Sequence, residues 1–344
     1  MGSYAIRRIA QLPAHDDRVW HVAWNPTKPL LATCSADKNV RLYHYTRRES
    51  GEIQFSLQHE IPTGHVKTVR AVAWSPSGHT LATASFDSNV GLWEQESEEW
   101  ECVGTLEGHE TECKSVGYSC TGTLLASCSR DKTVWIWEVL PDAEYECVSV
   151  LMEHTQDVKC VAWHPTEEIL ASASYDDTIK LYIDDPTDDW YCFSTLTGHG
   201  STVWSLAWSP THSYLASGSD DRTVRVWKRV SGHKWENVLV LEGHERSVYS
   251  VSWGTGTGRG RAEEEEGEEY LGWLASVGGD GVLRVWEMVN RAGQLSGREI
   301  VCERATHGVH DANAVRFSGR AGFEGVVATA GDDGSVGVWE ISSS

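Results

Sequence analysis

The sequence predicts an all-β fold, a seven-bladed β-propeller with four antiparallel strands in each blade. Three observations predict it. A pattern of short strands recurs along the chain, a His and an Asp stand at a fixed distance within most copies, and the copies follow one another without a domain-sized break. Repeats that cannot bury a core alone form one when they are stacked. Residues 1–344 are therefore predicted to form a single closed ring.

One copy of the repeat runs from His154 to Tyr182. VKCVAW alternates apolar and polar residues, EILASAS is a second apolar run and TIKLY is a third, while HPTEE and YDDT mark the turns. Short runs rich in Val, Ile, Tyr and Trp that are cut by turn residues are typical of antiparallel strands. The same pattern begins at four other His residues, which are His15, His65, His109 and His199.

A fixed spacing relates the copies to one another. In five copies an Asp follows the opening His by 22 residues, and an aromatic residue follows the Asp by six. These pairs are His15 and Asp37, His65 and Asp87, His109 and Asp131, His154 and Asp176, and His199 and Asp221. Two looser copies contain Asp280, preceded by His244, and Asp333, preceded by either His307 or His310. The spacing therefore predicts seven units of about 45–50 residues.

The recurring polar residues are expected to form one hydrogen-bond network per blade. The network would join the His, the Asp, the strand-ending aromatic residue and a Ser or Thr of the second strand. The Ser and Thr candidates are Thr33, Thr83, Ser127, Ser172, Ser217, Ser276 and Thr329. A catalytic triad occurs once per active site, whereas this set recurs about seven times, so we expect a structural role. Tyr43 and Tyr182 replace the Trp in two copies, where a phenol would have to supply the hydrogen bond.

The repeat resembles the WD40 propeller repeat. The resemblance rests on the period, on a Gly-His dipeptide before four copies and on a third strand that usually ends in Trp. It implies a ring that must close. Residues 4–12 precede the first His, and the last copy ends at Trp339 without an outer strand. We therefore expect residues 4–12 to complete the last blade and remove an open sheet edge.

Composition excludes several classes of function. A net charge of −21 argues against general nucleic-acid binding. No apolar run approaches the length of a membrane span, and the N-terminal residues lack the apolar core of a signal peptide. Nine Cys residues form no CxxC pair, so we expect free thiols in a reducing compartment, the cytosol or the nucleus.

The sixth copy contains a break in composition. Residues 254–272, GTGTGRGRAEEEEGEEYLG, are Gly-rich and then acidic. Such a sequence buries too little apolar area to order itself, so it is predicted to be a flexible, solvated insertion between the first and second strands of blade six. An acidic segment that binds a partner is the alternative.

One face of the ring is predicted to carry the binding function. The Asp turn and the His loop lie at the same end of a blade. The residue before each Asp and the residue five after each His should therefore form a rim. Loops carried on a rigid frame are common sites of ligand and partner binding. Cationic and aromatic residues are the interface anchors favoured for a peptide with carboxylates and an aromatic group. The rim candidates are Arg130, Arg70, Lys114, Lys159, Trp20, Trp204, Tyr249, Tyr175 and Phe86.

Several stretches are similar to one WD40 family in particular, the WD40 subunit of the cytosolic iron–sulfur cluster assembly targeting complex. These are HTQDVKCVAWHP, LASASYDDTIKLY, DDWYCFSTLTGH, STVWSLAW and SRDKTVWIWE. The resemblance implies a cytosolic scaffold without catalytic activity, which joins other subunits of the complex and receives apo iron–sulfur clients. It assigns a partner-binding role to Arg130. Leu181, Tyr182 and Ile183 stand where some relatives carry Leu-Tyr-Arg, read as a cochaperone contact, so the resemblance does not extend to that contact.

Two other classes of function remain alternatives. A WD40 subunit of a chromatin complex, or a substrate receptor of a ubiquitin ligase, would have the same fold. An enzyme is disfavoured because no metal motif, phosphate loop or singular nucleophile–base set stands out in the sequence. No Cys grouping has cluster-ligand spacing, so we expect no cofactor and no cluster bound by this chain.

Overall fold

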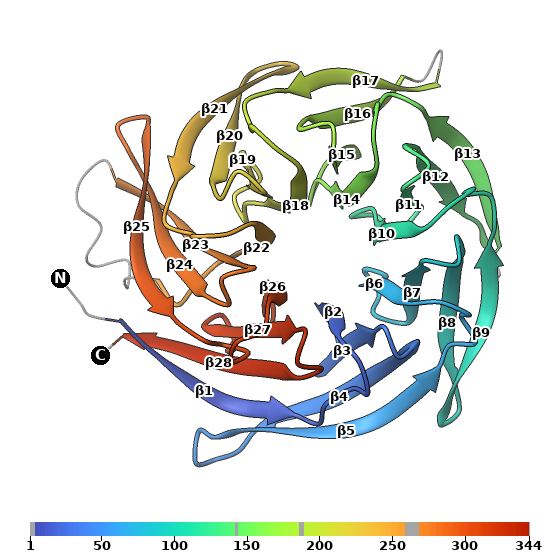
Figure 1. Ribbon diagram of the computed structural model, residues 1–344, viewed down its shortest axis with the longest axis horizontal. Helices are drawn as coiled ribbons and strands as arrows, with labels where there is room; N and C mark the ends of the chain where they lie inside the picture. The colour runs from blue at the N-terminus through green and yellow to red at the C-terminus, as the bar shows by residue number, and fades with distance from the viewer. Residues whose placement is uncertain (1–3, 142–143, 186–188, 259–267, 344) are drawn as a thin grey trace.

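The computed structural model of the protein describes residues 4–141, 144–185, 189–258 and 268–343. In these ranges seven four-stranded antiparallel sheets surround a central axis (Figure 1). The two ends of the chain lie beside the same blade (Figure 1). The predicted seven-bladed β-propeller is confirmed.

Each blade is a meander that runs outward from the axis. The innermost strands are β2 (Val19–Trp24), β6 (Val69–Trp74), β10 (Cys113–Tyr118), β14 (Val158–Trp163), β18 (Val203–Trp208), β22 (Val248–Gly254) and β26 (Ala312–Phe317). The second strands are β3 (Leu30–Ser35), β7 (Thr80–Ser85), β11 (Leu124–Ser129), β15 (Ile169–Ser174), β19 (Tyr214–Ser219), β23 (Glu268–Gly278) and β27 (Val326–Gly331). Blades one to seven are numbered in this order.

The outer half of each blade is built in the same way. The third strands are β4 (Asn39–Arg47), β8 (Val90–Glu96), β12 (Val134–Val139), β16 (Ile179–Asp185), β20 (Val224–Ser231), β24 (Leu283–Arg291) and β28 (Val336–Ser343). The outermost strands are β5 (Ile53–Pro62), β9 (Glu99–Leu106), β13 (Tyr145–Leu151), β17 (Asp189–Leu196), β21 (Lys234–Leu241), β25 (Gln294–Glu303) and, from the N-terminal end, β1 (Tyr4–Leu12). Residues 4–12, which the sequence predicts as the outer strand of the last blade, form β1.

The core lies between adjacent blades. Second strands such as β15 are buried along their whole length, because sheets of neighbouring blades cover both faces. Val19 of blade one packs in one cluster with Ala328 and Val338 of blade seven. The outermost strands instead alternate between buried and exposed residues, as β5 does, because they face solvent on one side. Burial between blades makes the whole ring the stable unit.

The ring is closed by pairing of the two ends of the described chain. β1 pairs antiparallel with β28, from Tyr4 opposite Ser343 to Leu12 opposite Val336. The Arg8 guanidinium lies 4.4 Å above the Trp339 ring centroid, and Arg7 Nη2 lies 2.9 Å from Glu340 Oε2. The predicted closure by residues 4–12 is confirmed, and it protects the outer edge of β28.

The predicted insertion at residues 254–272 is too long at both ends. β23 begins at Glu268, which pairs with Arg291, and Leu271 and Trp273 are fully buried. Gly256 has a φ of 64°, and a side chain there would collide with the Trp273 ring. The Gly-rich composition hid these contacts, because Gly256 permits a close approach rather than a solvated loop. Residues 259–267 lie outside the described residues, and the expectation for them remains a prediction.

The cysteines are free thiols, and four of them, Cys34, Cys113, Cys128 and Cys160, are buried in the strands. Burial raises the pKa of each of these four thiols above its usual value. Within the described ranges, no helix has the length and apolar character needed to cross a membrane.

Candidate functional site

A His–Asp–Ser/Thr network occurs in every blade. In blade four His154 Nδ1 lies 2.8 Å from Asp176 Oδ2, and His154 Nε2 lies 2.6 Å from Ser172 Oγ. Equivalent contacts join His15 and Asp37, His65 and Asp87, His109 and Asp131, His199 and Asp221, His244 and Asp280, and His307 and Asp333. His307, not His310, is therefore the opening His of blade seven.

The aromatic member of the network differs between blades. The indole N–H of Trp93, Trp137, Trp227 or Trp339 donates to the Thr or Ser hydroxyl at 2.9–3.0 Å. In blade four the Ser172 hydroxyl lies 3.3 Å from the phenol oxygen of Tyr182. In blade one the Tyr43 hydroxyl donates to the Pro13 carbonyl oxygen at 2.9 Å. The phenol therefore lies within reach of the network hydroxyl in blade four, whereas in blade one it bonds to the backbone of the entering chain.

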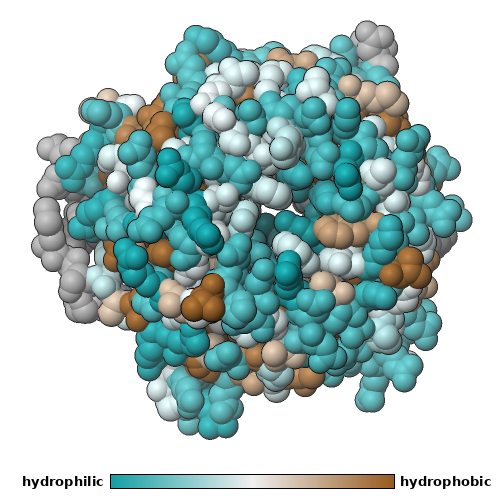
Figure 2. All heavy atoms as spheres, in the orientation of Figure 1, coloured by the Kyte–Doolittle hydropathy of each residue, from teal (hydrophilic) through white to brown (hydrophobic). Residues whose placement is uncertain are grey.

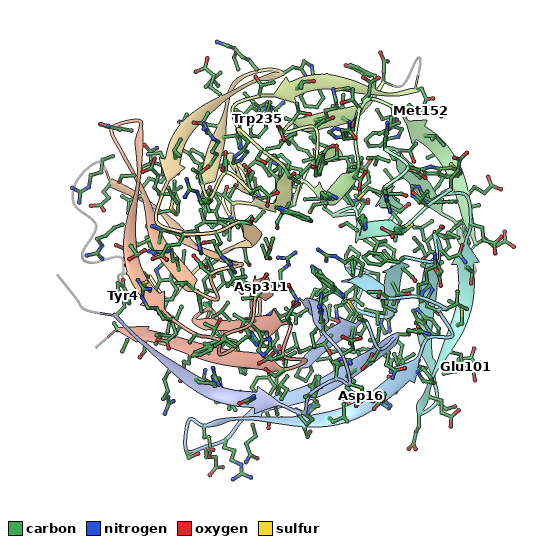
Figure 3. All side chains as sticks on the ribbon, viewed as in Figure 1. Tyr4, Asp16, Glu101, Met152, Trp235 and Asp311 are labelled. Atoms are coloured by element: carbon green, nitrogen blue, oxygen red, sulfur yellow. The ribbon has the colours of Figure 1, made fainter. Side chains whose placement is uncertain are left out.

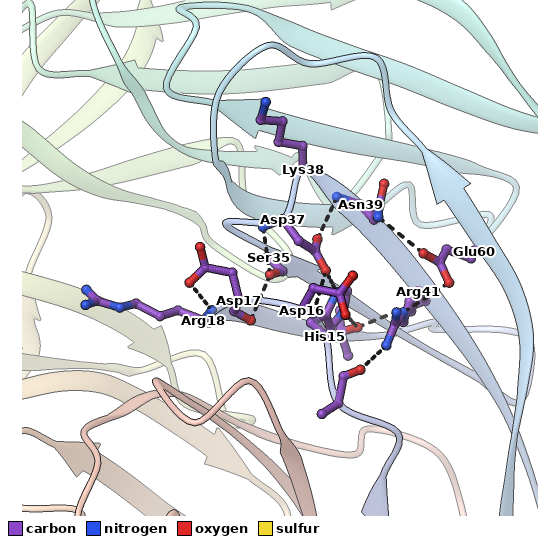
Figure 4. A network of polar contacts seen from close by, with 12 residues as sticks. His15, Asp16, Asp17, Arg18, Ser35, Asp37, Lys38, Asn39, Arg41 and Glu60 are labelled. Atoms are coloured by element: carbon purple, nitrogen blue, oxygen red, sulfur yellow. Dashed lines mark hydrogen bonds and ion pairs between the residues drawn. The ribbon is translucent and has the colours of Figure 1, made fainter.

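Each network Asp also holds its turn in shape. Figure 4 shows Asp37 accepting backbone N–H groups of Asp16, at 3.1 Å, and Asn39, at 2.9 Å, besides its contact with His15. Burial alone would raise the pKa of such a carboxyl, but hydrogen bonds from His109 and Thr133 lower the pKa of Asp131 to about 2. The other six network Asp residues also have lowered pKa values, for the same reasons.

A β-bulge in each innermost strand points one side chain at the axis. The register shifts after the first residue of the strand, between Val69 and Ala71 in β6 and between Val158 and Cys160 in β14. A bulge leaves one residue unpaired and re-aims its side chain. The seven bulge residues are Trp20, Arg70, Lys114, Lys159, Trp204, Tyr249 and Asn313.

These bulge residues surround a hollow of about 330 Å³, which we call the mouth. Figure 2 shows a hollow at the centre of the disc, bordered mainly by hydrophilic residues. Asp311 lies beside this opening in Figure 3, whereas Glu101 and Met152 lie at the circumference. The mouth is lined by Arg18, Trp20, Arg70, Phe86, Lys114, Lys159, Trp204, Tyr249, Asp311, Asn313 and Asp332. Seven of the predicted rim residues therefore lie together.

Three cations of the mouth, Arg70, Lys114 and Lys159, lie against aromatic rings. The Arg70 guanidinium lies 4.9 Å from the Trp20 ring centroid, and Lys114 Nζ lies 4.1 Å from that of Phe86. Lys159 Nζ lies between Trp204, at 5.0 Å, and Tyr175, at 5.4 Å. Each cation thus contacts an aromatic residue of its own or a neighbouring blade, which is a favourable contact across a blade boundary.

Two of the cations at the mouth are paired with carboxylates. Lys114 bonds to Glu112, and Lys159 Nζ lies 3.2 Å from Asp157 Oδ2. In both cases the acid stands two residues before the lysine, on the same side of the extended chain. These two carboxylates offset part of the charge that Lys114 and Lys159 bring to the mouth.

Arg130 and Tyr175 lie beside the mouth and do not line it. We call the surface that carries these two residues the outer slope. The Arg130 side chain is 59% exposed, with Nη1 3.6 Å from Glu112 Oε1 and Nε 4.0 Å from Asp157 Oδ2. Tyr175 is 55% exposed. Arg130 therefore contacts the same two carboxylates, Glu112 and Asp157, that pair with Lys114 and Lys159.

The family described as "WD domain, G-beta repeat" matches residues 6–44, 55–94, 100–138, 145–182, 190–228 and 235–287. The chain belongs to this WD40 repeat family. The matched segments include the His, Asp and aromatic positions of blades one to six, so the WD40 repeat accounts for the buried networks described above.

Curated relatives of this WD40 chain include proteins whose names refer to iron–sulfur protein assembly. "Probable cytosolic iron-sulfur protein assembly protein 1" of Mycosarcoma maydis is 46% identical over 31% of this chain and 32% of the relative. The "probable cytosolic iron-sulfur protein assembly protein CIAO1 homolog" of Chlamydomonas reinhardtii is 52% identical over 33% and 32%. "Protein CIA1" of Arabidopsis thaliana is 38% identical over 29% and 30%. The chain matches about a third of the length of these relatives.

Sequence reasoning missed three residues of the WD40 mouth. Asn313 is the seventh bulge residue, but it stands six rather than five residues after His307. Its amide donates to Asp332 Oδ1 at 2.8 Å and to the Val19 carbonyl oxygen at 3.0 Å. Arg18 and Asp311 belong to loops before the innermost strands, and Arg18 Nε lies 3.6 Å from Asp332 Oδ2. The register of the final repeat was the signal that could have identified Asn313.

The segment Leu181-Tyr182-Ile183 lies inside blade four of the WD40 ring. Leu181 and Tyr182 are fully buried in β16, and Tyr182 bonds to the network. A partner that bound this segment could reach neither side chain without opening the blade.

Proposed function

We propose that this WD40 protein is a non-catalytic scaffold of cytosolic iron–sulfur protein assembly. It would join other assembly factors in the cytosol and receive apo iron–sulfur clients. The observation that carries the proposal is the likeness to relatives from several organisms, two of which have names that refer to cytosolic iron–sulfur protein assembly. Because the alignments cover about a third of those relatives, the role is proposed for this chain rather than transferred from them.

The mouth and its outer slope are the proposed partner-binding surface. Trp20, Arg70 and Trp204 face one hollow, and Arg130 and Tyr175 stand beside it. Arg and aromatic residues dominate binding energy at protein interfaces. Their mixture suits a peptide segment that carries carboxylates and an aromatic side chain, as the sequence predicts.

The buried His–Asp–Ser/Thr sets support a role without catalysis. His154 and Ser172 are buried, and the Asp176 side chain is only 8% exposed, so a substrate has no access to them. The same set recurs in seven blades, as a structural element does and an active site does not.

Arg130→Glu is the test of the partner surface. Arg130 contributes only exposed ion pairs, so the folded state should lose little stability. Reversal of a charge that becomes buried in a complex should weaken partner binding by about 2–5 kcal/mol, at least about thirtyfold in affinity. The measurement pairs a melting curve with the affinity for co-purifying assembly factors. Arg48→Glu is the matched control, because Arg48 is exposed in the turn after β4.

A capture experiment from cytosol separates this function from its alternatives. Recovery of iron–sulfur assembly factors by the wild-type chain, with loss in Arg130→Glu and retention in Arg48→Glu, supports the proposal. Recovery of chromatin subunits or ubiquitin-ligase machinery instead would replace it. If a folded Arg130→Glu variant bound assembly factors with wild-type affinity, the outer slope around Arg130 would not be the partner-binding surface.

A further inference from the structure

The axial channel narrows below the mouth to a second cavity of about 30 Å³, which we call the waist. In the third position of the innermost strands six blades carry small residues or Cys160, and blade one carries His21. In the fifth position six blades carry Ala, Gly or Ser, and blade seven carries Arg316. The waist is lined by His21, Arg70, Ala71, Lys114, Ser115, Lys159, Cys160, Trp204, Ser205, Tyr249, Ser250, Asn313 and Arg316.

Arg316 is fixed at the waist by neutral acceptors. Its Nη1 donates to Ser250 Oγ at 3.0 Å and to the carbonyl oxygen of Val251 at 3.1 Å, and its Nη2 donates to His21 Nε2 at 2.8 Å. The His21 Nδ1–H then donates to the Val72 carbonyl oxygen at 3.1 Å. Burial, with Arg316 and Arg70 nearby, holds the pKa of His21 well below its usual value. The imidazole is therefore neutral and offers no counter-charge.

Arg70 is the second guanidinium of the waist. Within the described residues it makes no ion pair and no hydrogen bond, and its contact is the Trp20 ring at 4.9 Å. Burial lowers the pKa of Arg70, but the guanidinium remains charged at neutral pH. Its five N–H donors are therefore available to a ligand that enters from the mouth.

The waist collects positive charge without a carboxylate in its wall. Four cationic side chains line it, and no acidic residue of the described chain does. Lys114 and Lys159 pair with carboxylates on the rim above, Glu112 and Asp157. Arg70 and Arg316 have no carboxylate partner among the described residues. Arg70 and Arg316 are partly buried, and a partly buried cation without a carboxylate partner gains stability when a counter-charge is supplied. In a chain of net charge −21, this local excess is a specific feature of the channel.

We propose that the waist is an anion site that takes one compact oxyanion, of the phosphate or carboxylate class, between Arg70 and Arg316. Arg guanidinium groups bind such planar or tetrahedral oxyanions through paired N–H donors. The waist admits only a small group, and the wider mouth above it carries Asp311 and Asp332, which disfavour a large polyanion. The proposal does not depend on the scaffold function, because a free anion binds the chain alone.

The test titrates inorganic phosphate into the full chain at constant ionic strength, by calorimetry or by ³¹P line broadening. Wild type should bind with one site, and Arg70→Gln should bind at least about tenfold more weakly, as expected for the loss of a charge-assisted partner. Arg222→Gln is the matched control and should bind as wild type does, because Arg222 is exposed outside the mouth. Absence of binding by wild type, or equal binding by Arg70→Gln, would overturn the proposal.

Thermal melting gives a second readout. Without phosphate, Arg70→Gln should melt no lower than wild type, because it removes a partly buried cation that has no carboxylate partner among the described residues. Added phosphate should raise the melting temperature of wild type and of Arg222→Gln, but not that of Arg70→Gln. An equal shift in all three would contradict an anion site at the waist. If Arg70→Gln fails to fold, Lys159→Gln is the second variant. Lys159 also lines the waist, and its partner Asp157 lies at the rim, so this variant likewise removes a cation from the waist. Added phosphate should then fail to raise the melting temperature of Lys159→Gln.

The source of the oxyanion is distinguished by two further probes, acetylglycine and its amide. Competition with phosphate by the acid and not by the amide supports a carboxylate, such as a chain terminus, as an occupant. Competition by neither restricts the site to the phosphate class. Competition by both would mean that charge is not recognised and would contradict the proposal. Failure of these arms leaves the Arg130→Glu result unaffected, so the two proposals fail separately.

Discussion

The buried networks and the mouth use the same repeat in opposite ways. In each blade the His–Asp pair keeps nearly the same geometry, with the closest nitrogen–oxygen distances between 2.7 and 2.9 Å. At the mouth the equivalent position carries a cation in blades two to four, an aromatic residue in blades one, five and six, and an Asn in blade seven. The repeat determines where these side chains point but not what they are.

The difference separates stability from binding. A network residue is buried with several partners, so its loss leaves donors unsatisfied inside the blade. A mouth residue lines an open hollow on a bulge, where its identity is free to serve a ligand. Substitutions in the networks should therefore change unfolding, and substitutions at the mouth should change binding.

Deletion of residues 4–12 should have the largest effect and should break this separation. The deletion exposes the edge of β28 and the cluster around Leu12, and it loosens blade seven, which supplies Asn313 and Asp332 to the mouth. Stability and partner binding should fall together, with a loss of several kcal/mol and a melting temperature lower by at least about 5 °C. An unchanged melting curve would contradict closure by β1.

Asp176→Ala should affect only the network. It removes the acceptor for His154 and for the backbone N–H groups of Thr155 and Thr178. The free energy of unfolding in denaturant should fall by about 1–3 kcal/mol, with partner affinity retained in the folded fraction. Asp157→Ala, on the rim, is the matched counterpart and should alter affinity with little change in stability. If Asp176→Ala lowered affinity alone and Asp157→Ala lowered stability alone, the turn residues would be wrongly divided between the network and the rim.

Acid should weaken the networks within a defined range of pH. The seven network Asp residues have folded-state pKa values below the unfolded value near 3.9, so their contribution is fully present above about pH 4. It is lost as the pH falls through the folded pKa, which for Asp131 is about 2. Denaturant unfolding between pH 5 and about 2.5 should show this loss as a falling free energy of unfolding. The slope of that free energy against pH should be shallower in Asp131→Ala than in wild type. Equal slopes would contradict it.

Shortening blade six should have the smallest effect if the cut is placed correctly. Replacement of residues 259–267 by a short Gly-Ser turn should change the free energy of unfolding by no more than about 0.5 kcal/mol. Removal of the full segment 254–272 should cost at least about 2 kcal/mol, because it deletes the buried Leu271 and the strand pairing of Glu268. Equal stability of the two deletions would mean that the ends of the segment do not pack.

The sequence was sufficient for the blades, for the His–Asp pairs of blades one to six and for six of the seven bulge residues. Each of these follows from a fixed spacing, which the backbone converts into a fixed position. The waist was not predictable in this way, because His21 and Arg316 differ from the small residues at the same positions and nothing in the period indicates them. The pairing of Lys114 with Glu112 was missed although its two-residue spacing was visible. The buried end of β23 was hidden because Gly256 serves packing in a segment of loop-like composition.

The pairing of β1 with β28 has a consequence for biosynthesis. Residues 4–12 are synthesised before the rest of the described chain, whereas their partner strand is among its last parts to be made. Blades one to six can form in order as they emerge, but the final sheet needs both ends at once. Until then an unpaired strand edge remains open to other chains. Synthesis of β28 and its pairing with β1 are therefore the steps that complete the ring.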